Sequence, residues 1–378
     1  MTMAVRAVTV LLSALLAMTA LAAPAQAAYD STSSTRWSPD GPVRAIAVAG
    51  GVVYIGGLFD TMTSTSGAQV SVGNLAALDV ATGNLLPNWD ASTDNSVNAL
   101  AVSADRTRVF LGGNFLQVNG QDRKRLAAVS VADGDLIAGW DASATGIVND
   151  LLVRQDRVYV GGAFTSLDRA PAGRLGALSA LTGDRDPAFS PSANEPVNAL
   201  DTSAGRLLVA GRFSTVDGEP RPQLAAVDLT TNELSGWRPP KICPDCDNVW
   251  DLATGGGRVY AGVAGIGGRL VALSPRTGDV RWRVRANGDV QAVSFADGLV
   301  YAGGHFGARF GGQPRIDLAA ANAATGAVDP DFKPKVFDRY PGIRALVATP
   351  GALYAGGEFS GGVGTRDESP FFATFDTF

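Results

Sequence analysis

The chain has 378 residues, of which 46% are hydrophobic, and a net charge of −5 at pH 7. It can bury a large core, and it lacks the basic excess that general nucleic-acid-binding and anionic-membrane-binding proteins carry. Its 46 glycines indicate many tight turns and therefore a strand-rich protein.

The first 27 residues have the features of a secretory signal peptide. Arg6 supplies the positive charge, residues 7–21 are mostly apolar, and Ala25-Gln26-Ala27 is a small-residue cleavage site. The apolar run is short for a membrane span, and no later stretch is long enough. An uncleaved N-terminal anchor is the alternative. We therefore expect a secreted mature chain of residues 28–378 with no membrane span after signal cleavage.

One short sequence recurs along the chain. Residues 157–164 read Arg-Val-Tyr-Val-Gly-Gly-Ala-Phe, and edited copies lie at residues 53–59, 109–115, 208–213, 259–262, 300–306 and 353–359. Each copy belongs to a longer unit that opens with a Val-Asn-Ala-Leu-like run and closes on Thr-Gly-x-Leu-x-x-x-Trp. The units repeat about every fifty residues, the signature of a repeat architecture. They open at Val43, Val97, Val148, Val197, Val249, Val290 and Ile343.

Each unit contains four short runs of strand length and strand composition. In the second unit these are residues 97–103, 108–113, 126–131 and 135–141. After the signal peptide no segment of about ten residues keeps the helical spacing of apolar positions. Residues 28–378 are therefore predicted to form one all-β domain, a seven-bladed β-propeller of four-stranded blades.

The two ends of the chain complement each other. The seventh unit stops after its third run, at residues 371–376, and residues 34–39 match the blade-closing run that contains Trp89. We therefore expect the N-terminal strand to complete the last blade and close the ring.

Residues 75–85 and 270–282 resemble the blade-closing motif of quinoprotein-type propellers. Together with the Gly-Gly-x-Phe copies, they make the mature chain similar to the secreted bacterial delta-60-repeat β-propellers. That resemblance implies a propeller with a binding role and supplies no catalytic residues. Quinoprotein dehydrogenases usually have eight blades and a cofactor site with a metal; here there are seven units and no such site, so we predict no cofactor.

Cys243 and Cys246 are the two cysteines of the chain. In an exported protein, a local disulfide is the expected state of such a pair. Structural zinc needs about four ligands, and His305 is the one histidine, so we predict no metal site.

Candidate functional residues are those that depart from the repeating unit. Asn98, Asn149 and Asn198 share the second position of the first run and are expected to satisfy backbone groups between blades. At the same position the other units carry Arg44, Trp250, Gln291 and Arg344. These four belong to units five, six, seven and one, which are consecutive in a closed ring. Glu358 is a further departure, next to the glycine pair of the last unit.

Two arginines and an aromatic side chain on a concave wall suit a carboxylate or an acidic sugar. The structural alternative is that these arginines pair with nearby acidic groups in a wet channel. We predict an exported, non-catalytic, monomeric scaffold that binds a ligand at the channel mouth. The partner would be an acidic saccharide or a secreted or cell-surface protein, and not nucleic acid.

Two enzyme hypotheses remain open. A polysaccharide lyase or hydrolase acting on an acidic glycan would use the arc of blades 5-6-7-1, with His305 or Tyr340 exchanging the proton while an arginine neutralises the carboxylate. A quinone-dependent oxidoreductase rests on the blade motif alone.

Overall fold

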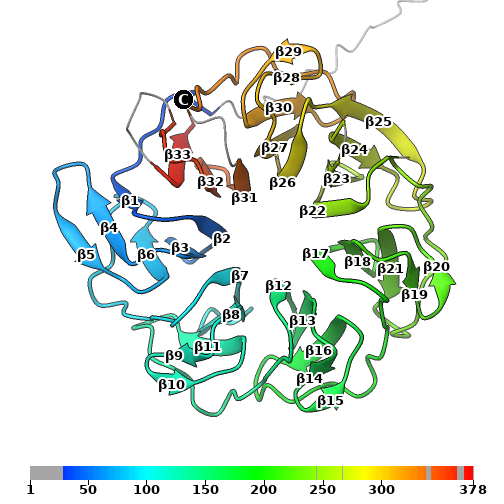
Figure 1. Ribbon diagram of the computed structural model, residues 1–378, viewed down its shortest axis with the longest axis horizontal. Coiled ribbons are helices and arrows are strands. Elements are labelled where there is room, and N and C mark those ends of the chain that lie inside the picture. The colour runs from blue at the N-terminus through cyan, green and yellow to red at the C-terminus, as the bar shows by residue number, and fades with distance from the viewer. Residues whose placement is uncertain (1–28, 244, 266, 338–341, 364–369, 378) are drawn as a thin grey trace, which may run out of the picture.

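The computed structural model describes residues 29–243, 245–265, 267–337, 342–363 and 370–377. All regular secondary structure in these residues is β-strand. Antiparallel sheets stand around a central axis, and the chain passes from one sheet to the next around it (Figure 1). The fold is a β-propeller. The described residues contain no helix long and apolar enough to cross a membrane.

The first strand of each sheet lies nearest the axis (Figure 1). These inner strands are β2 (Val43–Ala49), β7 (Val97–Val102), β12 (Val148–Arg154), β17 (Val197–Ser203), β22 (Asn248–Gly255), β26 (Asp289–Ala296) and β31 (Ile343–Ala348). Successive inner strands contact each other, and β31 also contacts β2.

The middle strands carry the glycine-containing repeat and are almost completely buried. They are β3 (Val52–Gly57), β8 (Arg108–Gly113), β13 (Arg157–Gly162), β18 (Arg206–Gly211), β23 (Arg258–Ala264), β27 (Leu299–His305) and β32 (Ala352–Gly357). The third strands are β6 (Leu75–Asp79), β11 (Leu126–Ser130), β16 (Leu175–Ser179), β21 (Leu224–Asp228), β24 (Arg269–Leu273), β30 (Leu318–Asn322) and β33 (Phe372–Asp376).

The prediction of four strands in every blade is wrong for most sheets. Only β22–β23–β24 gains a fourth strand, β25 (Val280–Arg285), among the described residues. Elsewhere the fourth run makes an isolated bridge, such as Leu85 with Leu78. Those runs contain a proline two residues before the aromatic residue, such as Pro87, or a glycine directly before it, such as Gly139, and both residue types interrupt a strand. β25 contains neither.

The loop between the middle and third strands forms a short outer hairpin in several sheets. These hairpins pair β4 (Thr61–Ser64) with β5 (Gln69–Ser71), β9 (Gln117–Val118) with β10 (Gln121–Asp122), β14 (Ser166–Leu167) with β15 (Ala170–Pro171), β19 (Thr215–Val216) with β20 (Glu219–Pro220), and β28 (Arg309–Phe310) with β29 (Gln313–Pro314).

The N-terminal segment contacts both the last and the first sheet. Ser34 N donates to Thr374 O of β33 at 2.8 Å, and Asp30 N donates to Asp376 O at 2.8 Å. Further along, β1 (Trp37–Pro39) pairs with β4 of the first sheet. The segment therefore joins the two ends of the chain.

Most middle strands contain a glycine pair, which permits two close approaches. A Cβ on Gly161 would lie 2.6 Å from Val197 Cγ1 of the next sheet, whereas a Cβ on Gly162 would overlap the carbonyl oxygen of Ile147 in the same sheet. The conflict at Gly161 involves side chains, and an alanine is accommodated at the equivalent position of β18, Ala210. The conflict at Gly162 involves the backbone and cannot be relieved by a rotamer change.

We expect Gly162→Ala to lower the free energy of unfolding by about 1–3 kcal/mol, the range for overpacking a rigid site. Gly161→Ala is the matched control and should cost less than half as much. Urea unfolding of both variants measures the difference. An equal or larger loss for Gly161→Ala would contradict this account of the second glycine.

Candidate functional site

Each inner strand contains a β-bulge at its second repeat position. In β2, Val43 pairs with Gly57 and Ala45 pairs with Gly56, so Arg44 has no partner residue on β3. A bulge turns its extra residue away from the regular alternation of the strand. The bulged residues of the inner strands are Arg44, Asn98, Asn149, Asn198, Trp250, Gln291 and Arg344. All of them line one axial cavity.

The axial cavity has a volume of about 420 Å³. Among its lining residues are the five that the sequence predicted as ligand-binding: Arg44, Trp250, Gln291, Arg344 and Glu358. They come from the consecutive strands β22, β26, β31 and β2 and from the residue after β32. The opposite wall carries the asparagines. The cavity is thus basic and aromatic on one side and rich in amides on the other.

Arg344 is held between two side chains. Its guanidinium lies over the Trp250 ring, 5.3 Å from the centroid, and its Nε lies 3.6 Å from Glu358 Oε1. Arg344 on β31 reaches past the intervening strand β26 to make the first contact. Arg344 Nε and Trp250 Nε1 are both buried without a hydrogen-bond partner among the described residues. Trp250 and Glu358 thus hold Arg344 in position. Two N–H donors beside the cavity have no hydrogen-bond acceptor among the described residues.

The asparagines bridge neighbouring inner strands, as the sequence predicted. Asn149 Nδ2 donates to Val197 O at 2.9 Å, and Asn198 Nδ2 donates to Val249 O at 3.0 Å. Each side chain satisfies a carbonyl of the next sheet. Their role is structural, although they also form part of the cavity wall.

Two aspartates of the cavity wall were missed by the sequence analysis. Asp150 Oδ2 accepts from Leu200 N of the next inner strand at 2.6 Å, and Asp251 Oδ2 accepts from Val293 N at 2.7 Å. A comparison of the repeating units could have found Asp150 and Asp251, since the other units carry alanine at the same position. Those alanines are Ala45, Ala99, Ala199, Ala292 and Ala345.

Burial perturbs these carboxyl groups. Desolvation raises the pKa of Asp150 to about 8, opposed by the amides it accepts from and reinforced by the charge of Asp251. Desolvation likewise raises the pKa of Asp251 to about 7. Asp201, on the strand between them, has its pKa raised to about 6 by the same cause. Burial thus shifts the pKa of all three carboxyl groups upward, most strongly for Asp150.

Of the two proposed catalytic residues, His305 can be placed. His305 is the last residue of β27, pairs in register with Asp289, and does not line the cavity. Tyr340 lies outside the described residues. The arginines and the histidine therefore do not form one catalytic group here.

Cys243 and Cys246 form a disulfide and are buried. They pack in a cluster with Trp237 and Val249, and Gln223 Nε2 donates to Cys246 O at 2.7 Å. The pair thus stabilises the connection into β22. In the part of the chain that the structure describes, no three histidine, cysteine or acidic residues lie close enough to hold a metal ion.

The raised pKa values predict how stability depends on pH. Between about pH 4 and pH 8 the folded protein binds more protons than the unfolded chain, so the free energy of unfolding should fall as the pH rises through this window. Asp150→Asn should make the slope shallower, as measured by urea unfolding at several pH values. Asp141→Asn, at an exposed position, is the control. Equal slopes in wild type and Asp150→Asn would rule out this assignment.

Comparisons with known proteins support the fold. A family model described as outer membrane protein assembly factor BamB matches residues 247–329. A search of curated proteins finds no match. Among solved structures, the chain is similar to U3-55K, with a TM-score of 0.62 and 12% identity over 92% of this chain and 100% of that chain.

Two further solved structures have WD40 repeats. The chain is similar to the WD40 β-propeller domain of Doa1, with a TM-score of 0.58 and 13% identity over 93% of this chain and 97% of that chain. It is also similar to the RRP9 WD40 repeats, with a TM-score of 0.61 and 11% identity over 93% and 99% of the two chains. At these identities the likeness concerns the fold, which is a β-propeller with quinoprotein-like repeats.

Proposed function

We propose that this chain is an exported, seven-bladed β-propeller scaffold that binds a carboxylate-bearing ligand in its axial cavity. The observation that carries the proposal is the pair Arg344 and Trp250, stacked on each other in the cavity wall, each with a buried N–H donor that has no hydrogen-bond acceptor among the described residues. Arg44 adds a second guanidinium to the same side. An acidic saccharide is the ligand class that fits best.

Each wall of the cavity suits a different part of such a ligand. A guanidinium matches the geometry of a carboxylate and is held here without full hydrogen bonding, so a ligand carboxylate would supply the missing acceptor. The Trp250 ring offers a face for a sugar. Gln291 and the opposite asparagines offer donors and acceptors for hydroxyl groups.

A binding role is better supported than catalysis. The enzyme hypothesis for an acidic glycan used His305 or Tyr340, and the first lies off the cavity while the second lies outside the described residues. The cavity aspartates each accept two backbone amides, which engages both oxygens. Propellers commonly mediate protein interactions, so an acidic segment of a protein partner at the channel mouth is the second candidate ligand.

The ring and its closure belong to the same proposal. Contacts between β31 and β2 and the bonds from Ser34 and Asp30 to β33 support a ring of seven blades that the N-terminal segment closes. Removal of residues 1–27 would leave this segment intact at the start of the mature chain.

The ligand hypothesis can be tested by thermal-shift measurements with uronic acids and acidic oligosaccharides. A ligand at about a hundred times its dissociation constant stabilises the folded state by about 2.7 kcal/mol, which gives a measurable increase in Tm. We expect this increase for the wild type and its loss in Arg44→Ala/Arg344→Ala.

The matched control for that variant is Arg154→Ala/Arg281→Ala, which removes the same charge from two exposed positions. It should respond as the wild type does. An equal response of both double variants would show that the ligand binds elsewhere. If no acidic saccharide shifts the wild type, the saccharide ligand is rejected and the protein partner remains.

Closure of the ring predicts a strong effect of a small truncation. Removal of residues 28–36 from the mature chain deletes the donors to β33 and should lower the Tm by several degrees, since about 1 kcal/mol per lost hydrogen bond shifts Tm by a few degrees in a chain of this size. Deletion of residues 1–27 alone is the control. An unchanged Tm after the longer deletion would contradict closure by this segment.

A further inference from the structure

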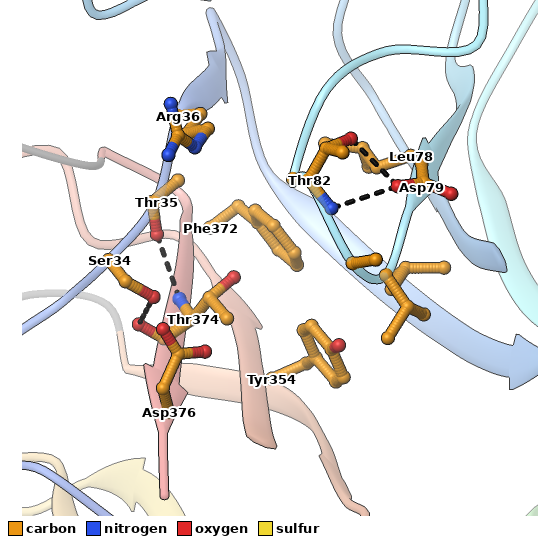
Figure 2. Close-up of a pocket in the computed structure, with 14 residues that line it drawn as sticks. Ser34, Thr35, Arg36, Leu78, Asp79, Thr82, Tyr354, Phe372, Thr374 and Asp376 are labelled. Atoms are coloured by element: carbon orange, nitrogen blue, oxygen red, sulfur yellow. Dashed lines mark hydrogen bonds between the residues drawn. The ribbon is translucent and has the colours of Figure 1, made fainter. Parts of the chain in front are cut away.

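A second cavity, of about 140 Å³, lies between the first and the last sheet. Figure 2 shows Tyr354, Phe372 and Thr374 of the last sheet facing Leu78, Asp79 and Thr82 of the first, with the N-terminal residues Ser34, Thr35 and Arg36 along one side. This cavity is separate from the axial one and shares no lining residue with it.

At the other junctions between neighbouring sheets an aromatic ring from the fourth run lies in the corresponding place. Trp89, for example, packs on Tyr54 with ring centroids 5.3 Å apart, and its Nε1 donates to Ser130 O of the next sheet at 3.1 Å. Trp140 does the same with Phe110 and Ser179 O. The rings in these positions are Trp89, Trp140, Phe189, Trp237, Trp282 and Phe332.

Between the last and the first sheet, Trp37 is partly buried against the core cluster that the two sheets share, and no described ring of the fourth run lines the cavity. Tyr354, which corresponds to Tyr54 in register, stacks instead on Phe372 of its own sheet, with centroids 6.3 Å apart. The methylene groups of Arg36 lie over Gly83, as the Trp140 ring lies over Gly183. Arg36 thus covers the glycine that a ring covers elsewhere, and the cavity beside Tyr354 is the part of that space that stays open.

The length of the connecting segment explains the missing ring. In the second unit Leu86 N bonds Ala77 O of the third strand, and Thr93 then bridges to the next outer hairpin. The corresponding residues at the N-terminus are Ser34 and Pro39, so this segment is two residues shorter.

The shorter segment changes the position of its aromatic residue. Trp37, the counterpart of Trp89 in sequence, lies in β1, pairs with Ser64, and does not line the cavity.

The cavity also keeps the acceptor that three of the four indoles use elsewhere. Ser130 O accepts from both Gly134 N and Trp89 Nε1. The corresponding carbonyl, Asp79 O, accepts from Gly83 N at 2.8 Å, and no described side chain takes the second position. A carbonyl oxygen has two lone pairs, so one acceptor site remains.

We propose that this cavity is a binding site for a small planar ring with an N–H donor, of the indole class. The ring would pack between Tyr354 and the third strand of the first sheet and donate its N–H to Asp79 O. Binding there would bridge the first and last sheets, and a ligand that binds only the folded protein stabilises it. The proposal does not depend on the ligand of the axial cavity.

The first test compares two ligands on the wild-type protein by isothermal titration calorimetry. Indole should bind saturably at one site per chain, and 1-methylindole, which has the same ring without the N–H, should bind about five-fold more weakly, the ratio expected for one hydrogen bond. Uronic acids present in excess should not compete with indole, which separates this site from the axial cavity.

The second test restores the missing length. Insertion of Asp-Ala between Trp37 and Ser38 recreates the order Trp-Asp-Ala-Ser of residues 89–92. Trp37 should then fill the cavity, raise the Tm and abolish indole binding. The matched control carries the same insertion together with Trp37→Ala, which leaves the cavity open and should still bind indole.

The proposal is supported if indole binds saturably and 1-methylindole binds more weakly. Indole binding should also be lost only in the insertion variant that keeps Trp37. The proposal is overturned if the wild type shows no saturable binding, if the two ligands bind equally, or if the two insertion variants have the same affinity. The comparison of ligands on the wild type does not depend on how either variant folds.

Discussion

Each sheet of this propeller is held against the next by a valine or isoleucine side chain that packs over a glycine, or over Ala210 in β18. Val197 packs over Gly161, Ile343 over Gly303, and Val43 over Gly356, which brings the first sheet against the last. Any side chain larger than the Ala210 of β18 at the glycine position would push the sheets apart. The repeat therefore reflects a packing requirement between neighbouring sheets. It does not by itself indicate a chemical function.

The bulge in each inner strand gives the protein a variable surface. Because the bulged residue has no partner on the middle strand, its side chain is free to change without loss of pairing. Asparagine at this position ties adjacent sheets together through a backbone carbonyl. Arginine, tryptophan and glutamine in the other sheets give up that bond and leave polar groups beside the axial cavity. The architecture thus confines functional variation to one position per sheet.

The junction between the first and last sheets differs from the others because the chain has ends there. Its fourth run comes from the N-terminus and has to reach both β33 and the outer hairpin of the first sheet. A segment two residues shorter makes both contacts but moves Trp37 into β1. The ring that fills the other junctions is therefore lost, and the cavity next to Tyr354 results.

Much of the fold could be predicted from the sequence because the repeat is regular. The period, the positions of the inner and middle strands, and the all-β class follow from Gly, Tyr and Val residues that recur at fixed offsets. The cavity residues Arg44, Trp250, Gln291 and Arg344 could also be selected, since a departure from a repeating unit is visible without coordinates. Asp150 and Asp251 also depart from the repeating unit. They were equally visible in the sequence but were overlooked.

Other features depended on distances between units, which the order of residues does not contain. The stacking of Arg344 on Trp250 spans an intervening sheet, and the bond from Asp150 to Leu200 joins two inner strands. The prediction of a fourth strand was wrong for most sheets. Proline and glycine interrupt the backbone pairing that the aromatic pattern suggested. The sequence by itself determined which residues repeat and which depart. The propeller geometry alone decided which departures meet, because it brings together residues about fifty to a hundred positions apart.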